Sequence, residues 1–143
     1  MAGGAYLKTV MSWSAKQYTA FEDERTRPVR DLLSALPDFE GGRVIDLGCG
    51  PGNSTEVLCS RYPLAVASGV DSSEDMILAA KKRLPQVKFE LADVTDWSDP
   101  GPYEVILANA LFQWVPNHER VFPGLMRKLR SGGALAIQMP DNL

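Results

Sequence analysis

A short apolar run that leads into a glycine-rich loop constrains this chain more than any other feature of its sequence. Residues 44–47 read Val-Ile-Asp-Leu, and glycines follow at positions 48, 50 and 52. Such a run is typical of a strand buried on both faces, as in a parallel sheet. Because Asn53 or Ser54 can begin a helix directly after the loop, the segment predicts a strand–loop–helix unit.

The same alternation of strand-like and helix-like segments continues along the chain. Further strands are predicted at 65–70, 87–91, 105–108 (within the segment 103–109) and 134–138, and helices at 53–61, 73–80 and 121–129. Residues 131–133 are expected to form the loop before the last strand. Strands that alternate with helices predict crossover units, so the fold class is α/β, a mostly parallel sheet in a three-layer sandwich.

The first forty residues are expected to be helical. One segment carries Tyr18 and Phe21, and a second opens near Pro28, a residue that is tolerated in a first helical turn. The second segment places apolar side chains at 29, 32, 33 and 36, which is the stripe of a helix packed against a core.

Charge and composition exclude several classes of function. Fifteen basic and eighteen acidic residues give a net charge of -3, which argues against non-specific nucleic-acid binding. No apolar run approaches the roughly 20 residues that span a bilayer, and no signal peptide is evident, so a cytoplasmic protein is expected. Cys49 and Cys59 form no Cys-x-x-Cys pair, which predicts two reduced thiols and no metal site.

Asp46 indicates what kind of ligand the glycine loop suits. A dinucleotide fingerprint needs its third glycine at position 53, where this chain has asparagine. A carboxylate directly before the loop would also repel a pyrophosphate, whereas it would attract a cofactor that carries an ammonium and a sulfonium group. A cationic nucleoside is therefore favoured over NAD, although an NAD-dependent oxidoreductase remains the alternative.

Two more acidic residues follow strands. Asp71 ends the second predicted strand, where a carboxylate can accept hydrogen bonds from ribose hydroxyls; its alternative role is to cap the next helix. Asp93 follows the third strand and can accept a hydrogen bond from an exocyclic adenine amine, although a simple turn residue would look the same.

These motifs carry a family resemblance. The loop at 44–53, the strand that ends in Asp71 and the segment Ala92-Asp93-Val94 resemble the cofactor motifs of class I S-adenosylmethionine-dependent methyltransferases. The segments at 13–18, 21–28, 108–116 and 138–142 resemble those of the trans-aconitate 2-methyltransferases within that superfamily. The resemblance implies a Rossmann-like core and S-adenosylmethionine as the cofactor.

The resemblance also implies roles for individual positions. Asn109 and Ala110 would approach the methionine part, Asp93 and Val94 the adenine, and an N-terminal cover would close over the cofactor. The implied cofactor-binding residues are Trp13, Gln17, Tyr18, Asp46, Gly48, Gly50, Asp71, Ser72, Asp93, Val94, Asn109 and Ala110. Gln113 and Trp114 would lie beside the transferred methyl group, and Arg27 would meet an anionic acceptor. No metal is implied.

The chain departs from the family in its number of strands. Class I methyltransferases have seven, and the sequence predicts five before residue 143. The expected organisation is a helical cover at 1–40 and a cofactor-binding core at 41–143 that is truncated at its C-terminus. With no partner strand, 134–138 is expected to expose apolar surface around Leu135 and Ile137 and to favour self-association.

The predicted function is methyl transfer to a carboxylate oxygen of a small polycarboxylic acid, with trans-aconitate implied by the resemblance. Two alternatives remain open beside the NAD-dependent enzyme. One is a truncated module that binds the cofactor without turnover, and the other is a methyltransferase with a different small-molecule acceptor.

Overall fold

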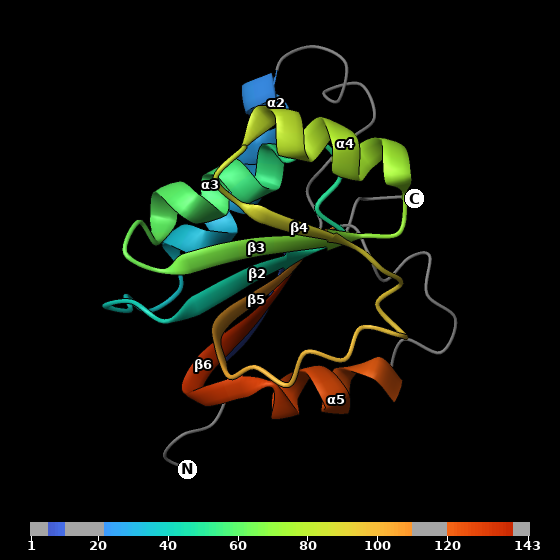
Figure 1. Cartoon of the computed structure of the whole chain (residues 1–143). Helices are drawn as coiled ribbons and strands as arrows, with labels where there is room; N and C mark the ends of the chain where they lie inside the picture. The colour runs from blue at the N-terminus through green and yellow to red at the C-terminus, as the bar shows by residue number, and fades with distance from the viewer. Residues whose placement is uncertain (1–5, 11–21, 110–119, 139–143) are drawn as a thin grey trace.

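One parallel sheet organises the part of the chain that the computed structural model describes, residues 6–10, 22–109 and 120–138. Within these residues it has six strands, in the order β1-β6-β5-β2-β3-β4 (Figure 1). They are β1 (Tyr6–Val10), β2 (Arg43–Leu47), β3 (Val66–Asp71), β4 (Lys88–Leu91), β5 (Tyr103–Asn109) and β6 (Leu129–Gln138). The five strands expected from the sequence are β2 to β6, so the predicted α/β architecture is confirmed.

Helices cover both faces of the sheet. Helices α2 (Glu22–Ser34), α3 (Asn53–Arg61) and α4 (Glu74–Arg83) lie on one face, and α5 (Val121–Arg127) lies on the other (Figure 1). The central strands alternate between the two layers: Val44 packs with α2 and α3, whereas Ile45 packs with Leu125 of α5. Both side chains are buried, which explains the continuous apolar run of β2.

The register brings the carboxyl ends of the central strands to one edge. Leu47, the last residue of β2, lies opposite Val70 of β3 and Ala108 of β5. Asp71 in turn lies opposite Leu91 of β4. The chain moves outward from β2 through β3 to β4 and then returns to β5 on the other side of β2. The point where strand order reverses is therefore at β2, whose carboxyl end carries the glycine loop.

A local signal accounts for where α4 begins, whereas α2 begins earlier than its sequence suggested. The side chain of Ser73 accepts a hydrogen bond from the backbone N–H of Met76 at 3.4 Å and caps α4, so the cap is Ser73 rather than Asp71. The sequence suggested that Pro28 lies in the first turn of this helix. Helix α2 instead begins at Glu22, which places Pro28 in its interior. Pro28 is buried beside Val29, and this packing offsets the backbone hydrogen bond that proline cannot make.

The N-terminal segment differs from the sequence-based expectation. Residues 6–10 form a strand and not a helix, and this strand pairs in parallel with β6 over Ala134–Gln138. The sequence Tyr-Leu-Lys-Thr-Val contains aromatic and β-branched residues that favour strands, but such preferences are decided largely by the neighbouring strand. Here β6 supplies the backbone groups for the ladder.

This pairing corrects the expectation for the last strand. Residues 134–138 do have a partner strand, and Leu135 and Ile137 are 0% and 2% exposed rather than forming an apolar surface. They pack with Leu125 of α5 in the second helix layer. The premise for self-association through this strand is therefore wrong.

The glycines at 132 and 133 lie inside β6 and not in a loop before it. The register shifts between Tyr103 and Val105 of β5, where extra residues of β6 form a bulge. A Cβ at Gly133 would lie 3.0 Å from the backbone oxygen of Glu104, so only glycine lets the two strands approach so closely. The loop predicted at 131–133 is therefore part of β6, where it forms the bulge.

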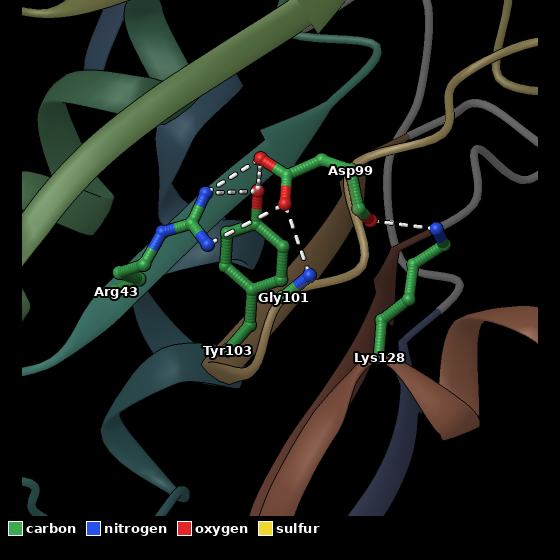
Figure 2. A network of polar contacts seen from close by, with 5 residues as sticks. All are labelled: Arg43, Asp99, Gly101, Tyr103 and Lys128. Atoms are coloured by element: carbon green, nitrogen blue, oxygen red, sulfur yellow. Dashed lines mark hydrogen bonds and ion pairs between the residues drawn. The ribbon is translucent and has the colours of Figure 1, made fainter.

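A polar network closes the end of the sheet opposite the glycine loop (Figure 2). The Asp99 carboxylate accepts hydrogen bonds from Arg43 at 2.6 Å, from the Tyr103 hydroxyl at 2.9 Å and from Gly101 N–H at 2.9 Å. Lys128 donates to the Asp99 backbone carbonyl at 2.6 Å. The bond to Arg43 is the main reason that the pKa of Asp99 falls to about 2. The network ties the loop between β4 and β5 to the starts of β2, β5 and β6.

Candidate functional site

The glycine loop at 48–52 is fastened to the neighbouring strand β3. The N–H groups of Gly48 and Cys49 both donate to the Val70 carbonyl, at 2.7 Å and 3.0 Å. Gly50 has a φ of 55°, in the left-handed region that favours glycine, and a Cβ placed there would meet no atom of the described residues within 4 Å. The loop is therefore held to β3 by hydrogen bonds, while the described residues leave space beside Gly50 in which a ligand could approach the backbone.

Asp71 links the loop to β3 and to the start of α4. Its Oδ2 accepts a hydrogen bond from Gly50 N–H at 2.9 Å, and its Oδ1 accepts one from Ser73 N–H at 2.9 Å. Because a carboxylate has about four acceptor positions, both oxygens can still accept bonds from hydroxyls. The structure thus brings together Gly50 and Asp71, two of the predicted cofactor residues, and leaves the predicted Ser72 exposed beside them.

Asp46 occupies a different place from the other acids. It is 0% exposed and lies under the loop, where its Oδ2 accepts hydrogen bonds from Ser54 Oγ at 2.6 Å and Thr55 Oγ1 at 2.8 Å. Burial is the main cause that raises the pKa of Asp46 to about 7, and the two hydroxyls oppose it. From the sequence Asp46 was expected to act on the ligand by its charge, but its two hydroxyl partners were not foreseen.

Asp93 and Val94 follow β4 at the same edge. The backbone N–H of Ala92 donates to the Asp71 carbonyl at 3.0 Å, which ties this turn to the end of β3. Asp93 is exposed and accepts hydrogen bonds from Thr95 N–H at 2.9 Å and Thr95 Oγ1 at 2.8 Å, and these bonds lower its pKa. Val94 packs against the core cluster on the α5 side of the sheet.

Three carboxylates therefore lie near the carboxyl ends of neighbouring strands. Asp46 is the residue before the last in β2, Asp71 ends β3, and Asp93 follows β4. Gly50, Asp71 and the turn before Asp93 are joined by hydrogen bonds, so these residues form one continuous edge. The described part of the chain contains no group of three or more side chains suited to a metal. An edge of this charge suits a cationic ligand that also carries hydroxyl and amine donors.

Gly69 supports the loop, a role that was not predicted from the sequence. It lies opposite Asp46 and Phe89 in the sheet, and a Cβ there would be 2.7 Å from the Phe89 ring and 3.1 Å from Cβ of Cys49. Cys49 is buried in this space, and burial raises the pKa of its thiol, which makes it a packing residue and not a nucleophile. A glycine in the middle of an apolar strand was the available signal.

The other predicted residues are only partly described. Asn109 ends β5 opposite Gln138, at the same edge as the loop. Arg27 lies on the exposed side of α2. Trp13, Gln17, Tyr18, Ala110, Gln113 and Trp114 lie outside the described residues.

A polar groove of about 240 Å³ separates α2, α3 and the end of α4. Arg30 and Arg83 line it, and Arg83 forms an ion pair with Glu56 at 2.9 Å. Asn53, the first residue of α3 after the loop, also contributes to this groove. The groove thus places cationic side chains near the start of α3.

Sequence comparisons identify relatives of known name. The family model described as a methyltransferase domain matches residues 44–133. Trans-aconitate 2-methyltransferase of Rhizobium meliloti (strain 1021) is 53% identical over 133 residues, and that of Rhizobium rhizogenes (strain K84 / ATCC BAA-868) is 56% identical over 133 residues. Each alignment covers 93% of this chain and 52% of the relative. The chain therefore spans about half the length of the curated relatives it matches.

Solved methyltransferase structures share the fold. The plantazolicin methyltransferase BpumL, in complex with a pentazolic desmethylPZN analog and SAH, is 28% identical, has a TM-score of 0.59 and aligns with 80% of this chain and 44% of its own. Coclaurine N-methyltransferase, bound to N-methylheliamine and SAH, is 22% identical, with a TM-score of 0.70 over 87% of this chain and 38% of its own. The described residues contain no helix long and apolar enough to cross a membrane. The strand order, the glycine loop and the family match together establish that this chain belongs to the methyltransferase domain family, with the class I S-adenosylmethionine-dependent methyltransferase fold.

Proposed function

We propose that this chain is the cofactor-binding part of an S-adenosylmethionine-dependent methyltransferase. The observation that carries the proposal is the hydrogen bond from Gly50 N–H to Asp71 Oδ2 at 2.9 Å, which joins the open glycine loop to the acid at the end of the next strand. The membership of the methyltransferase domain family and the relatives named above support it.

The described residues fit this cofactor. The described residues leave open space beside Gly50. Asp71 retains acceptor positions for two ribose hydroxyls, and the exposed Asp93 can accept a hydrogen bond from an adenine amine. Asp46 adds a buried carboxylate with one oxygen, Oδ1, that has no partner among the described residues. These negatively charged acceptors suit a cation and would be unfavourable for the pyrophosphate of NAD.

The remaining cofactor contacts are proposed from the resemblance. Trp13, Gln17 and Tyr18 would belong to a cover formed by residues 1–40 over the core at 41–143, with the strand β1 as part of that segment. Asn109 and Ala110 would face the methionine part, and Gln113 and Trp114 would flank the transferred methyl group.

The chain's own residues would act by binding and alignment. Bound S-adenosylmethionine supplies an electrophilic methyl group, and a carboxylate acceptor is already ionised at neutral pH. No general base is then required, so the contribution of the protein is to hold the acceptor oxygen in line with the methyl group. Alignment of this kind is worth up to about 7–11 kcal/mol of the barrier.

We further propose a small polycarboxylic acid as the acceptor, with trans-aconitate as the first candidate. The relatives that bear this substrate in their names are 53–56% identical to the chain, which supports the choice. A polyanion needs fixed cations, and arginine binds carboxylates in a bidentate manner. Arg27 and Arg30 on α2 are the described candidates. A different acceptor, or binding without turnover, remains the alternative.

Two measurements test these proposals. Calorimetric titration with S-adenosylhomocysteine and with NAD should give binding of the first ligand only, and the reverse result would overturn the cofactor assignment. A methyl-transfer assay over a panel of small carboxylic acids should then give product with trans-aconitate. Cofactor binding without product for any acid would favour the binding module.

A further inference from the structure

A buried carboxylate lies under the glycine loop and is held by two hydroxyl groups. Ser54 Oγ and Thr55 Oγ1 donate to the same atom of Asp46, Oδ2, at 2.6 Å and 2.8 Å. The other oxygen, Oδ1, accepts no hydrogen bond from the residues that the structure describes. Both hydroxyls belong to the first turn of α3, so Oδ2 is fixed by that helix, whereas the buried Oδ1 has no hydrogen-bond partner among the described residues.

The two hydroxyls are themselves buried on the inner side of α3. Ser54 is 4% exposed and Thr55 is 0% exposed, at positions where a helix packed on a sheet usually carries apolar side chains. Buried hydroxyls are costly unless they are hydrogen-bonded, and here each one is bonded to Asp46. Their placement is therefore specific for the carboxylate.

Among the described residues, few other charged groups lie near Asp46. Asp71 from β3 is the nearby charged group, and its negative charge disfavours ionisation of Asp46 by raising the pKa. Cys49 of the loop and Cys59 of α3 also face it, and both thiols have raised pKa values and are neutral. On the other side, the residue of β5 opposite Asp46 is Leu107, and leucine carries no charge. The hydroxyls of Ser54 and Thr55 are thus the interactions that favour the ionised form.

We propose that Ser54 and Thr55 are positioning residues for the cofactor. They favour the ionised form of Asp46 and orient its carboxylate, so that its negative charge attracts the ammonium and sulfonium groups of S-adenosylmethionine. This inference rests on the proposed methyltransferase function. In a water-poor interior a single charge acts more strongly than it does in water. S-adenosylhomocysteine has no sulfonium charge, so the ionised carboxylate favours the substrate form of the cofactor over the product form.

The first test needs no ligand. Carbon-13 NMR can follow ionisation of the Asp46 carboxyl in the 143-residue chain and in Thr55→Val, which keeps the shape of threonine without the hydroxyl. Loss of one hydrogen bond to a charged group should move the midpoint to higher pH, by about a tenfold change in the ionisation constant. Thr55→Ser should restore the parent midpoint. Ser60→Ala, which removes an exposed hydroxyl from the same helix, should leave it unchanged.

The second test measures the affinity for both forms of the cofactor between about pH 6 and about pH 9. At about pH 7 the Thr55→Val chain should bind S-adenosylmethionine about fivefold more weakly than the parent, because the ionised fraction of Asp46 falls from about one half to about one tenth, with a smaller loss for S-adenosylhomocysteine. The difference should narrow as the pH rises and Asp46 ionises in both chains. Each variant is compared with the parent at the same pH, because the amino group of the ligand titrates in this range.

Two outcomes would overturn the positioning role. One is an unchanged NMR midpoint in Thr55→Val, and the other is an equal loss of affinity for both ligands at every pH, which a purely structural role would produce. Ser54→Ala provides the same comparison if Thr55→Val does not fold. A parent chain that binds neither ligand would refute the proposed function instead, so the two failures are distinguishable.

Discussion

Asp71 Oδ2 accepts a hydrogen bond from the backbone N–H of Gly50 at 2.9 Å, across 21 positions of sequence. This bond connects the loop that leaves β2 to the last residue of β3. The second oxygen of Asp71 accepts from Ser73 N–H, so a single side chain fixes the loop and the start of α4 together. A ligand that binds beside Gly50 and donates its hydroxyls to Asp71 would therefore contact two parts of the chain that one carboxylate already joins.

Replacement of Asp71 should weaken cofactor binding. In Asp71→Ala both Gly50 N–H and the ribose hydroxyls lose an acceptor, and bonds to charged groups are worth roughly 1.5–3 kcal/mol each. We expect at least a tenfold weaker affinity for S-adenosylhomocysteine in a calorimetric titration. Asp75→Ala, which removes an exposed acid from the first turn of α4, should bind as the parent does. Equal affinity in the two variants would exclude Asp71 from the site.

Gly69→Ala should destabilise the chain through steric overlap. Its Cβ would come within 2.7 Å of the Phe89 ring and 3.1 Å of Cys49, and overpacking of this kind costs about 1–3 kcal/mol. Urea unfolding should show this loss, and Phe89→Leu in the same chain should recover part of it.

Gly124→Ala is the matched control for Gly69. Its Cβ would meet only the end of the Arg127 side chain at 4.0 Å, and alanine favours a helix by about 1 kcal/mol over glycine. This variant should be as stable as the parent or more so. A loss of stability equal to that of Gly69→Ala would contradict the steric explanation.

Asp46→Asn should increase stability at alkaline pH. Burial raises the pKa of Asp46 from 3.8 to about 7, so the native state retains its proton longer than the unfolded state does. This stabilisation is complete below the unfolded pKa and is lost as the pH rises through about 7. The neutral amide avoids the buried charge, and we expect a gain of about 1–3 kcal/mol at about pH 8.

Urea unfolding at about pH 5 and about pH 8 separates this effect from a change of packing. At the lower pH Asp46 is protonated in the native state, so the advantage of asparagine should be much smaller. The same variant should bind S-adenosylmethionine more weakly at about pH 8. A gain that is independent of pH would show that the buried charge is not its source.

The network at the opposite end of the sheet should stabilise the chain above acidic pH. Arg43 holds the pKa of Asp99 at about 2, below its usual 3.8, so the contribution is present at neutral pH and is lost as the pH falls toward about 2. Both side chains are partly exposed, at 40% and 32%, and we expect Asp99→Asn to cost about 1 kcal/mol at neutral pH. Asp38→Asn, whose 92% exposed side chain pairs with Arg61, should cost less. A cost for Asp99→Asn that persists at about pH 2 would show that its charge is not responsible.

Arg27→Ala should affect the acceptor more than the cofactor. If Arg27 meets a carboxylate of the acceptor, the KM for trans-aconitate should rise about tenfold or more, while the affinity for S-adenosylhomocysteine changes little. Arg127→Ala on α5 is the control for loss of a cation. Unchanged turnover at limiting acceptor would remove Arg27 from the acceptor site.

The sequence by itself determined the fold class and the edge of the sheet at which Gly50 and Asp71 meet. Short runs of mostly apolar residues such as 44–47 and 105–108, each followed by glycine or a polar residue, are typical of strands in a sheet that is covered on both faces. There the side chains on both sides of the strand are buried. In a parallel sheet the residues that follow these runs meet at one edge, so the proximity of Gly50 and Asp71 follows from the order of strands and loops along the chain.

Tertiary structure decided the features that depend on a distant neighbour. Residues 6–10 have a local preference for a strand, but they form one because β6 offers them a row of backbone groups, and the local sequence does not identify that partner. Pro28 is accommodated inside α2 because its ring is buried in the packing of that helix. The partners of Asp46 were missed because a hydroxyl at 54 or 55 looks locally like a helix start, and only the packing of α3 on β2 turns both toward the buried carboxylate. Local sequence sets the periodicity of each element, whereas burial and hydrogen bonding of its side chains are set by elements far away in the chain.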